Sequence, residues 1–334
     1  SGDRLDYRKC NRHRRRRVYS KLNMAKLAFL FPGQGSQYVG MGQRLFNEDG
    51  EAKRVFEEAS GVLGFDIADL CFNGPEEKLN LTQYTQPAIL TVSIAAYGLL
   101  TREGFLPDMV AGHSLGEYSA LVASDAMKFT DAVYLVHRRG IYMQEALSPD
   151  KSLVAAILGL DRLGVEDICR EASGKGIVSV ANYNSPVQIV IAGEKEAVRL
   201  ALDMAEKRKA KRTIILPVSA PVHSPLMKDA AERLSLDMEK IGIGDLRYPL
   251  FCNVDAMPIS RGEEARSCLI RQITSPVQWE DSIRRMIVSG VSSFIEIGPK
   301  NVLTGLVKRI DKNVRTSNIE NRDSLKEAMD IIWT

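Results

Sequence analysis

The stretch VAGHSLGEYSALVAS, Val110–Ser124, constrains the fold more than any other part of this sequence. It places Ser114 between Gly112 and Gly116, after a short apolar run and before a helix-like pattern. This is the G-x-S-x-G pattern of a nucleophile elbow, a tight strand-to-helix turn that exposes a serine hydroxyl. Such a helix start also directs free N–H groups toward a forming oxyanion. A serine in a plain glycine-rich turn is the alternative, and the flanks favour the nucleophile.

Apolar runs alternate with helical patterns on both sides of this turn. Strands alternating with helices predict an α/β fold whose parallel sheet is covered by helices on both faces. The predicted strands are 26–31, 108–114, 249–254 and 292–298, and the predicted helices are 43–59, 86–102, 116 onward, 130–147, 224–241, 262–273, 279–289 and 302 onward.

The middle of the chain has a different order. Strands at 152–160, 176–183, 187–193 and 212–218 are separated by helices at 163–173 and 194–210. The order β-α-β-β-α-β is that of a ferredoxin-like unit. We therefore predict a ferredoxin-like small domain, 150–217, inserted into a large hydrolase-like catalytic domain made of 24–149 and 218–334. A cleft between the two is the expected place for a site.

The net charge of +3 arises at one end of the chain. Residues 1–23 hold nine Lys and Arg against two Asp and Glu, and the remainder carries 36 basic and 40 acidic residues. This mildly acidic body has no broad basic face for nucleic acid. The basic head fits a nucleic-acid arm, a targeting peptide or non-native sequence, and we expect it to be non-native or disordered because MAKLAFLFPG reads like a natural start.

The five cysteines are an odd number and include no CxxC pair. This usage favours a reducing, cytoplasmic location and argues against a zinc site or any other metal site. No run of about 18 apolar residues exists, so the sequence predicts no membrane span.

A nucleophilic serine needs a base, and the chain offers four histidines. His13 lies in the basic head, His113 adjoins the serine, and His137 lies inside a predicted helix as a solvated or packed residue. His223, in VSAPVHSPLM, follows a predicted strand and precedes a helix. Catalytic bases are common in such loops, so His223 is the best candidate.

The third member of a catalytic triad is not evident from the sequence. No Asp or Glu stands out after a strand between Ser114 and His223. A backbone carbonyl can orient an imidazole instead, by accepting its Nδ1–H. The loop FPGQGSQ, residues 31–37, is a second glycine-rich strand end that either offers an N–H to an oxyanion or is a plain turn.

Eight motifs follow one another in a characteristic order: FPGQGSQYVGMG, TQPAIL, AGHSLGEYSALVAS, RRGIYMQEA, NYNSPVQIVIAG, VSAPVHSPLM, SPVQW and IEIGPKNVLTGL. In this order they resemble the malonyl-CoA:acyl carrier protein transacylases of type II fatty acid synthesis. The resemblance runs from about Met24 to Ile310. It implies the α/β fold with a ferredoxin-like insert described above.

The resemblance also implies catalytic roles. It makes Ser114 the residue that takes the malonyl group as an ester, and His223 the general base and then the general acid. The backbone N–H groups of Gln34 and Leu115 form the oxyanion hole. The carbonyl that accepts the histidine N–H is placed at Gln272.

Further implied roles concern the substrate. Arg139, not Arg138, binds the malonyl carboxylate, which a planar guanidinium matches in shape and charge. His113 lines the pocket. Val222, before the histidine, departs from the bulkier or distinctive residues of related acyltransferase domains, which leaves open how strictly malonyl is selected.

The expected activity is ping-pong transfer of malonyl from malonyl-CoA to the phosphopantetheine thiol of acyl carrier protein, by a monomer without a bound cofactor. A serine hydrolase using the same Ser and His, and a non-catalytic scaffold that binds the carrier, are the alternatives. No nucleic acid or membrane is expected as a partner. Basic residues at 206–212, EKRKAKR, are candidates for carrier contact or a solvated helix face.

Overall fold

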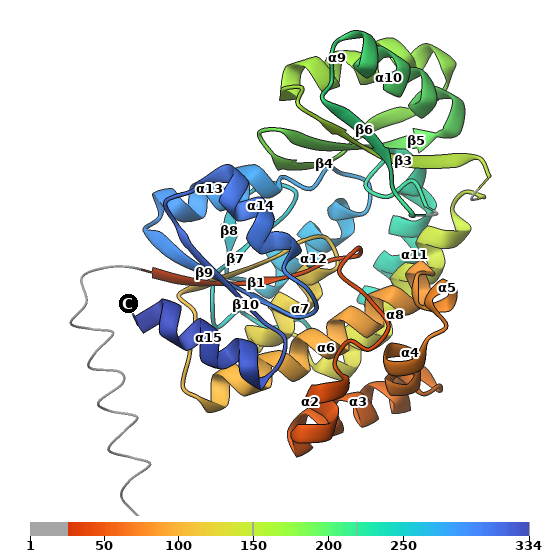
Figure 1. The fold of residues 1–334 in the computed structure, drawn as a ribbon. Helices are drawn as coiled ribbons and strands as arrows, with labels where there is room; N and C mark the ends of the chain where they lie inside the picture. The colour runs from red at the N-terminus through yellow and green to blue at the C-terminus, as the bar shows by residue number, and fades with distance from the viewer. Residues whose placement is uncertain (1–25, 149, 219, 334) are drawn as a thin grey trace, which may run out of the picture.

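The computed structural model describes residues 26–333 apart from 149 and 219. The predictions for residues 1–23 lie outside the described residues. The rest of the chain forms two sheets, and each lies in its own lobe with its own helices (Figure 1). The predicted α/β fold with a second, smaller sheet is confirmed.

The large sheet has the strand order β10-β9-β1-β2-β7-β8. All neighbours pair in parallel except β8, which runs antiparallel to β7 at one edge. Its strands are β1 (Lys26–Phe31), β2 (Met109–Gly112), β7 (Leu250–Phe251), β8 (Pro258–Ile259), β9 (Val291–Ile297) and β10 (Arg315–Ile319).

Alternate residues of β1 enter two different apolar cores. Leu27, Phe29 and Phe31 pack with the larger group of helices, whereas Ala28 and Leu30 pack with α13 and α14. Burial on both faces explains why β1 reads as one continuous apolar run rather than an alternating one. The large-domain helices are α2 (Gln43–Glu48), α3 (Gly50–Leu63), α4 (Ile67–Asn73), α5 (Glu76–Leu79), α6 (Thr82–Arg102), α7 (Gly116–Ala123), α8 (Phe129–Glu145), α11 (Lys228–Met238), α12 (Gly262–Gln272), α13 (Trp279–Val288), α14 (Val302–Ile310) and α15 (Arg322–Trp333).

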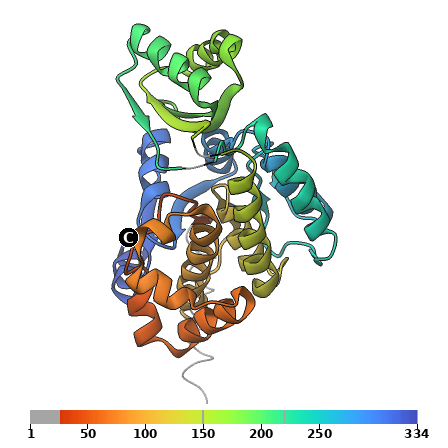
Figure 2. The ribbon, with the colours of Figure 1, turned by 90° about the vertical axis from the view of Figure 1, so that its right-hand side faces the viewer.

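The small sheet has the order β4-β5-β3-β6, and all its pairs are antiparallel. This order and the sequence of elements are those of a ferredoxin-like unit. Its two long helices cover the sheet face that points away from the large lobe (Figures 1 and 2). The elements are β3 (Ser152–Leu158), α9 (Arg162–Ala172), β4 (Val178–Ser185), β5 (Gln188–Glu194), α10 (Lys195–Lys207) and β6 (Arg212–Ile215). The domain limits drawn from the sequence stay a prediction.

The edge strand of the small sheet is hydrogen-bonded to the large lobe. The N–H of Tyr183 donates to the Val277 carbonyl at 2.9 Å, and the Val277 N–H donates to the Ala181 carbonyl at 2.9 Å. This short parallel bridge joins β4 to the segment between α12 and α13. The small lobe is therefore anchored beside the residues that follow Gln272.

Two predicted helices differ from the observed ones. The helix predicted over 43–59 is interrupted at Asp49, whose Oδ1 accepts the N–H groups of Glu51 and Ala52 at 3.0 Å and caps α3. A carboxylate there satisfies donors that helix starts leave free. The helix predicted from 224 begins with a short 3₁₀ turn, Pro225–Met227, before α11.

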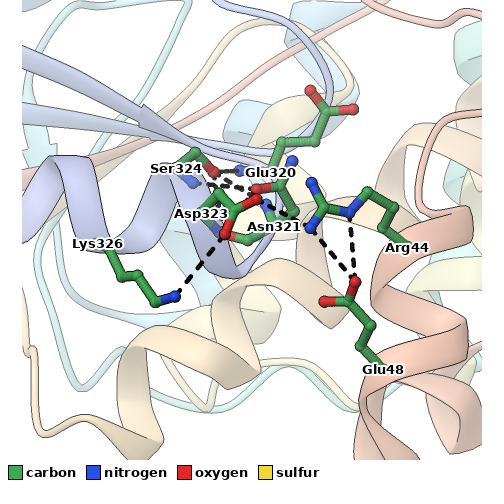
Figure 3. Close-up of polar contacts among 7 residues, drawn as sticks. All are labelled: Arg44, Glu48, Glu320, Asn321, Asp323, Ser324 and Lys326. Atoms are coloured by element: carbon green, nitrogen blue, oxygen red, sulfur yellow. Dashed lines mark hydrogen bonds and ion pairs between the residues drawn. The ribbon is translucent and has the colours of Figure 1, made fainter.

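The final strand and helix, β10 and α15, were not predicted. Asn321 Oδ1 accepts the N–H groups of Asp323 and Ser324 at 3.0 Å, which caps α15. Asp323 also pairs with Arg44 of α2 at 2.9 Å, and Arg44 reaches Glu48 (Figure 3). These contacts join the last helix to the first, although exposed pairs of this kind contribute little stability.

Every helix within 26–148, 150–218 and 220–333 is too short or too polar to cross a lipid bilayer.

Candidate active site

Ser114 lies on the turn between β2 and α7, with a positive φ of 52°. The neighbouring backbone leaves no room for side chains at the two flanking glycines. A Cβ on Gly112 would lie 1.9 Å from the Gly116 carbonyl carbon, and one on Gly116 would lie 2.0 Å from the Phe31 carbonyl oxygen. Close packing of the turn against the end of β1 thus requires both glycines and holds the serine in a strained conformation.

The loop after β1 packs directly against this turn. A Cβ on Gly33 would lie 2.4 Å from the His113 carbonyl oxygen, so the backbone at Gln34 runs beside Ser114. No turn or loop hydrogen bond among the described residues uses the N–H of Gln34 or of Leu115. The Gln34 side chain is turned to Thr82, with Nε2 at 3.4 Å from Oγ1. Both N–H groups named for an oxyanion hole are therefore available to a ligand.

His223 is brought to Ser114 from the loop before α11. Its Nε2 lies 2.7 Å from Ser114 Oγ, and its Nδ1 lies 2.8 Å from the Gln272 carbonyl oxygen. A carbonyl can only accept, so Nδ1 carries the proton and the Nε2 lone pair faces the serine. Burial has the largest effect on the pKa of His223 and the positive charge of Arg139 the second largest; both act to lower this pKa, which is about 3. The imidazole is therefore neutral near pH 7 and able to take the serine proton.

Arg139 of α8 is buried beside the serine, with 1% of its surface exposed. Nη2 lies 3.0 Å from Ser114 Oγ and 2.9 Å from Gln272 Oε1, and Nη1 lies 2.8 Å from Gln86 Oε1. These acceptors are neutral. Arg138, the preceding residue of α8, forms an ion pair with Asp237. Among the described residues, no ion pair includes Arg139. Burial lowers the pKa of the Arg139 guanidinium, and an anionic ligand would compensate its charge.

The two remaining histidines of the described chain point elsewhere. His113 Nε2 lies 2.8 Å from Asn184 Oδ1 of β4, and its ring centroid is 5.3 Å from that of Trp279. It therefore sits where the small lobe meets the turn. His137 bonds the Gln83 carbonyl at 2.9 Å and packs among aromatic rings, which fits a packed helix residue.

Two residues that the sequence did not single out hold the turn in place. Asn253, just after β7, accepts the Ser114 N–H on Oδ1 at 2.6 Å and donates from Nδ2 to the Gly112 carbonyl at 2.7 Å. Glu117 of α7 accepts the Asn253 N–H at 2.5 Å and also accepts from Gln272 Nε2. Gln272 Nε2 lies 3.0 Å from the Ser114 carbonyl. One buried network thus links the serine turn to the histidine's acceptor.

The sequence carries one usable signal for this network. Glu117 is fully buried, and burial raises the pKa of its carboxyl group. Hydrogen bonds from Asn253 and Gln272 act in the opposite direction and lower this pKa. A glutamate inside the apolar run SLGEYSALVA is a recognisable candidate for a buried, partnered charge. Asn253 has no such signal, because the pairing of β2 with β7 is what brings it to the turn.

The absence of a metal site, expected from the sequence, stays a prediction. Cys252, Asp255 and Cys268 place one ligand atom each within 4.8 Å of one another. Arg271 already binds both oxygens of Asp255, at 2.9 and 2.6 Å, so the carboxylate has a cation as its partner.

Comparison with known proteins defines the class of this site. The model of the acyl transferase domain family matches residues 28–325, and the chain belongs to that family. Within the family, it is 44% identical to the malonyl CoA-acyl carrier protein transacylase of Bacillus subtilis strain 168, over 92% of this chain and 97% of the relative. It is also 44% identical to the transacylase of the same name from Escherichia coli K12, over 92% of this chain and 100% of the relative.

Solved structures agree with these relatives. The malonyl CoA-acyl carrier protein transacylase of Coxiella burnetii has a TM-score of 0.90 at 41% identity, covering 92% of this chain and 97% of that one. A malonyl-transacylase solved in complex with its type II PKS acyl-carrier protein has a TM-score of 0.89 at 42% identity, covering 92% and 99%. The resemblance drawn from the eight sequence motifs is confirmed.

Proposed function

We propose that this protein transfers the malonyl group of malonyl-CoA to the phosphopantetheine thiol of an acyl carrier protein, through a malonyl ester on Ser114. The family and its named relatives support the reaction class. The malonyl-transacylase solved with its acyl-carrier protein supports the choice of acceptor. Monomeric state, cytoplasmic location and the absence of a bound cofactor belong to the same proposal.

In the first half-reaction, His223 Nε2 takes the Ser114 hydroxyl proton while Oγ attacks the thioester carbonyl. The N–H groups of Gln34 and Leu115 donate to the oxyanion that forms. The carbon–sulfur bond then breaks, and the imidazolium returns its proton to the departing coenzyme A sulfur. The Gln272 carbonyl stabilises the imidazolium by accepting Nδ1–H throughout.

In the second half-reaction, the carrier thiol gives its proton to the neutral His223. The thiolate attacks the malonyl ester, and the same two N–H groups stabilise the second oxyanion. The ester bond breaks, and Ser114 Oγ recovers the proton from the imidazolium. Because each half-reaction returns the imidazole to its neutral form, one base serves both.

One observation carries the choice of malonyl over an uncharged acyl group. Arg139 is a buried cation 3.0 Å from the nucleophilic oxygen, and its hydrogen-bond partners are all neutral. A carboxylate two bonds beyond the thioester carbonyl would reach this guanidinium and could form a two-point pair with it. A generic serine hydrolase has no need of such a buried cation.

Intact-mass spectrometry tests the proposal directly. The protein is exposed separately to malonyl-, methylmalonyl- and acetyl-CoA, and S114A is treated in parallel. We expect a malonyl adduct on the wild type, little acetyl adduct, and none on S114A. Addition of holo-acyl carrier protein should discharge the adduct to the carrier, whereas release as free malonate would favour the hydrolase.

A further inference from the structure

A pair of thiols lies directly behind the active site. Cys252 follows β7 and Cys268 lies in α12, and both side chains are buried. Their sulfur atoms and a carboxylate oxygen of Asp255 all lie within 4.8 Å of one another. A disulfide requires sulfur atoms about 2 Å apart, so only a local rearrangement separates these thiols from a bond.

The surroundings of the pair make the two sulfurs unequal. Hydrogen bonding by Cys268, followed by the backbone N–H groups of Asp255 and Met257, lowers the pKa of the Cys252 thiol. The neighbouring Cys252 raises the pKa of Cys268. Arg271 Nη2 lies 3.4 Å from Cys268 Sγ. Two thiols this close to each other can form a disulfide once either sulfur is oxidised, because the second can attack the first.

Access to the pair runs through an ion pair at the surface. Arg271 and Asp255 cover the thiols, and their side chains are 45% and 43% exposed. The pair is bidentate, with both Asp255 oxygens bound at 2.9 and 2.6 Å, and both side chains border solvent. A peroxide molecule must displace this ion pair to reach the sulfur atoms, which are themselves buried.

Both cysteines are coupled to the catalytic residues through the chain. Cys252 precedes Asn253, which holds the Ser114 N–H at 2.6 Å. Cys268 lies one helical turn before Gln272, whose carbonyl holds His223 at 2.8 Å. Drawing the two sulfurs together would displace the end of β7 and α12 relative to each other, and with them both supports of the site.

We infer that Cys252 and Cys268 form a redox modification site, at which a small peroxide converts the two thiols into a disulfide and thereby slows acyl transfer. One of the two cysteines, Cys252 or Cys268, attacks the peroxide O–O bond as its thiolate, giving a sulfenic acid and hydroxide. The other cysteine then attacks the oxidised sulfur, the S–S bond forms, and water leaves. Overall, two thiols lose two electrons and two protons, and hydrogen peroxide becomes two molecules of water.

The position of Arg271 favours oxidation of the two thiols over binding of a metal ion by the same residues. It binds both carboxylate oxygens of Asp255, the third candidate ligand. A divalent cation would have to compete with the guanidinium for that carboxylate, whereas oxidation needs only the two sulfurs.

The test uses the full chain with C10S, so that Cys10 cannot form mixed disulfides. The protein is treated with hydrogen peroxide and analysed by non-reducing peptide mass spectrometry and by malonyl transfer to holo-acyl carrier protein. We expect a Cys252–Cys268 linked peptide and a fall in kcat of about tenfold or more, because displacements near 1 Å in an active site have costs of this order or larger. Dithiothreitol should restore kcat.

Two variants serve as controls. C10S/C268S should form no such peptide and keep its kcat under peroxide. C10S/C169S, which lacks a buried cysteine whose thiol pKa is raised by burial, should behave like C10S. Inactivation without the linked peptide, or a linked peptide with unchanged kcat, would overturn the inference. The activity readout rests on the proposed function: if untreated protein has no transferase activity, that function fails, while the linked peptide is still measured.

Discussion

Among the described residues, the charged side chains that are buried lie in the large lobe, although both lobes carry ion pairs at their surfaces. The large lobe buries an arginine and a glutamate, Arg139 and Glu117, within one network around Ser114. The ion pairs of the small lobe lie at its surface, as with Arg162–Glu166 at 3.1 Å and Arg208–Glu171 at 2.5 Å. Burying a charge is costly unless it is compensated. The contrast supports the large lobe as the location of the proposed chemistry, and the largest effects are expected from substitutions there.

Ser114→Ala should abolish transfer, because the proposed covalent bond is made by the hydroxyl oxygen. The fold should persist, since alanine fits the turn that serine occupies. Intact mass after malonyl-CoA treatment and transfer rate to the carrier are the measurements. Ser119→Ala is a matched control, since Ser119 is a buried serine of α7 whose hydroxyl has no partner among the described residues. Normal turnover by S114A would remove Ser114 as the nucleophile.

His223→Ala should lower kcat by about a hundredfold to ten-thousandfold, the range for lost general acid–base assistance. Binding of malonyl-CoA should change little. His137→Ala is the control, because His137 packs inside the helical layer and, within the described part of the chain, has its hydrogen bond to the Gln83 carbonyl. Equal losses in the two variants would show that both histidines act through the fold.

The pH profile gives an independent check on His223. The protonated imidazole cannot take the serine proton, so activity is present above its pKa and lost below it. With that pKa lowered to about 3, kcat/KM of the free enzyme should stay level from about pH 8 to pH 5 and decline only at lower pH. A decline centred near the ordinary histidine pKa of about 6.5 would contradict the buried, neutral state described here.

Arg139→Ala should lower malonyl transfer by about 30-fold to several thousandfold, because an unpaired buried anion costs about 2–5 kcal/mol. Acetyl transfer should be equal to or better than that of the wild type. Arg139→Lys should rescue malonyl transfer only in part, since a point charge cannot form the two-point pair. The measurement is kcat/KM with both acyl donors.

The neighbouring arginine is the control for this selectivity. Arg138 pairs with Asp237 at 3.2 Å and bonds Tyr142, away from the serine. Arg138→Ala should therefore lower Tm, because Asp237 is buried, and leave the ratio of malonyl to acetyl transfer unchanged. If R139A lost malonyl transfer and acetyl transfer to the same extent, the role of Arg139 would be structural.

Glu117→Gln tests the network that holds the serine turn. Both carboxylate oxygens accept, from Asn253 N–H and Gln272 Nε2, and a glutamine would turn its NH₂ toward one of these donors. Leaving a buried donor without an acceptor costs about 1–3 kcal/mol, so the free energy of unfolding should fall by that amount and kcat should fall with it. Glu145→Gln, at an exposed pair with Arg233, should change neither. Wild-type stability in E117Q would exclude a Glu117 whose two oxygens both accept hydrogen bonds.

The sequence predicts those residues of the candidate site that carry a local sequence pattern. Glycines around Ser114 and the loop position of His223 are local patterns, and so are the apolar runs, separated by helical patterns, that predicted both sheets. The role proposed for Arg139 comes from the resemblance, because an arginine in a helix has the same sequence pattern whether it is buried or solvated. Asn253 and the Cys252–Cys268 pair were missed because only the pairing of β2 with β7 and the packing of α12 bring them together. The final helix, α15, was missed as well.

The smallest effect is expected where the charges are exposed, at the basic segment 206–212 that joins α10 to β6. Lys207→Glu/Arg208→Glu should raise the KM for the carrier by a few-fold and leave that for malonyl-CoA unchanged, because reversing a rim charge mainly alters association with an oppositely charged partner. Added salt should reduce the difference. Lys53→Glu/Arg54→Glu reverses a matching exposed pair on α3, on the large lobe away from the small sheet (Figure 1), and should leave carrier kinetics unchanged. A wild-type KM for the carrier in Lys207→Glu/Arg208→Glu would remove the segment 206–212 from consideration as a carrier contact.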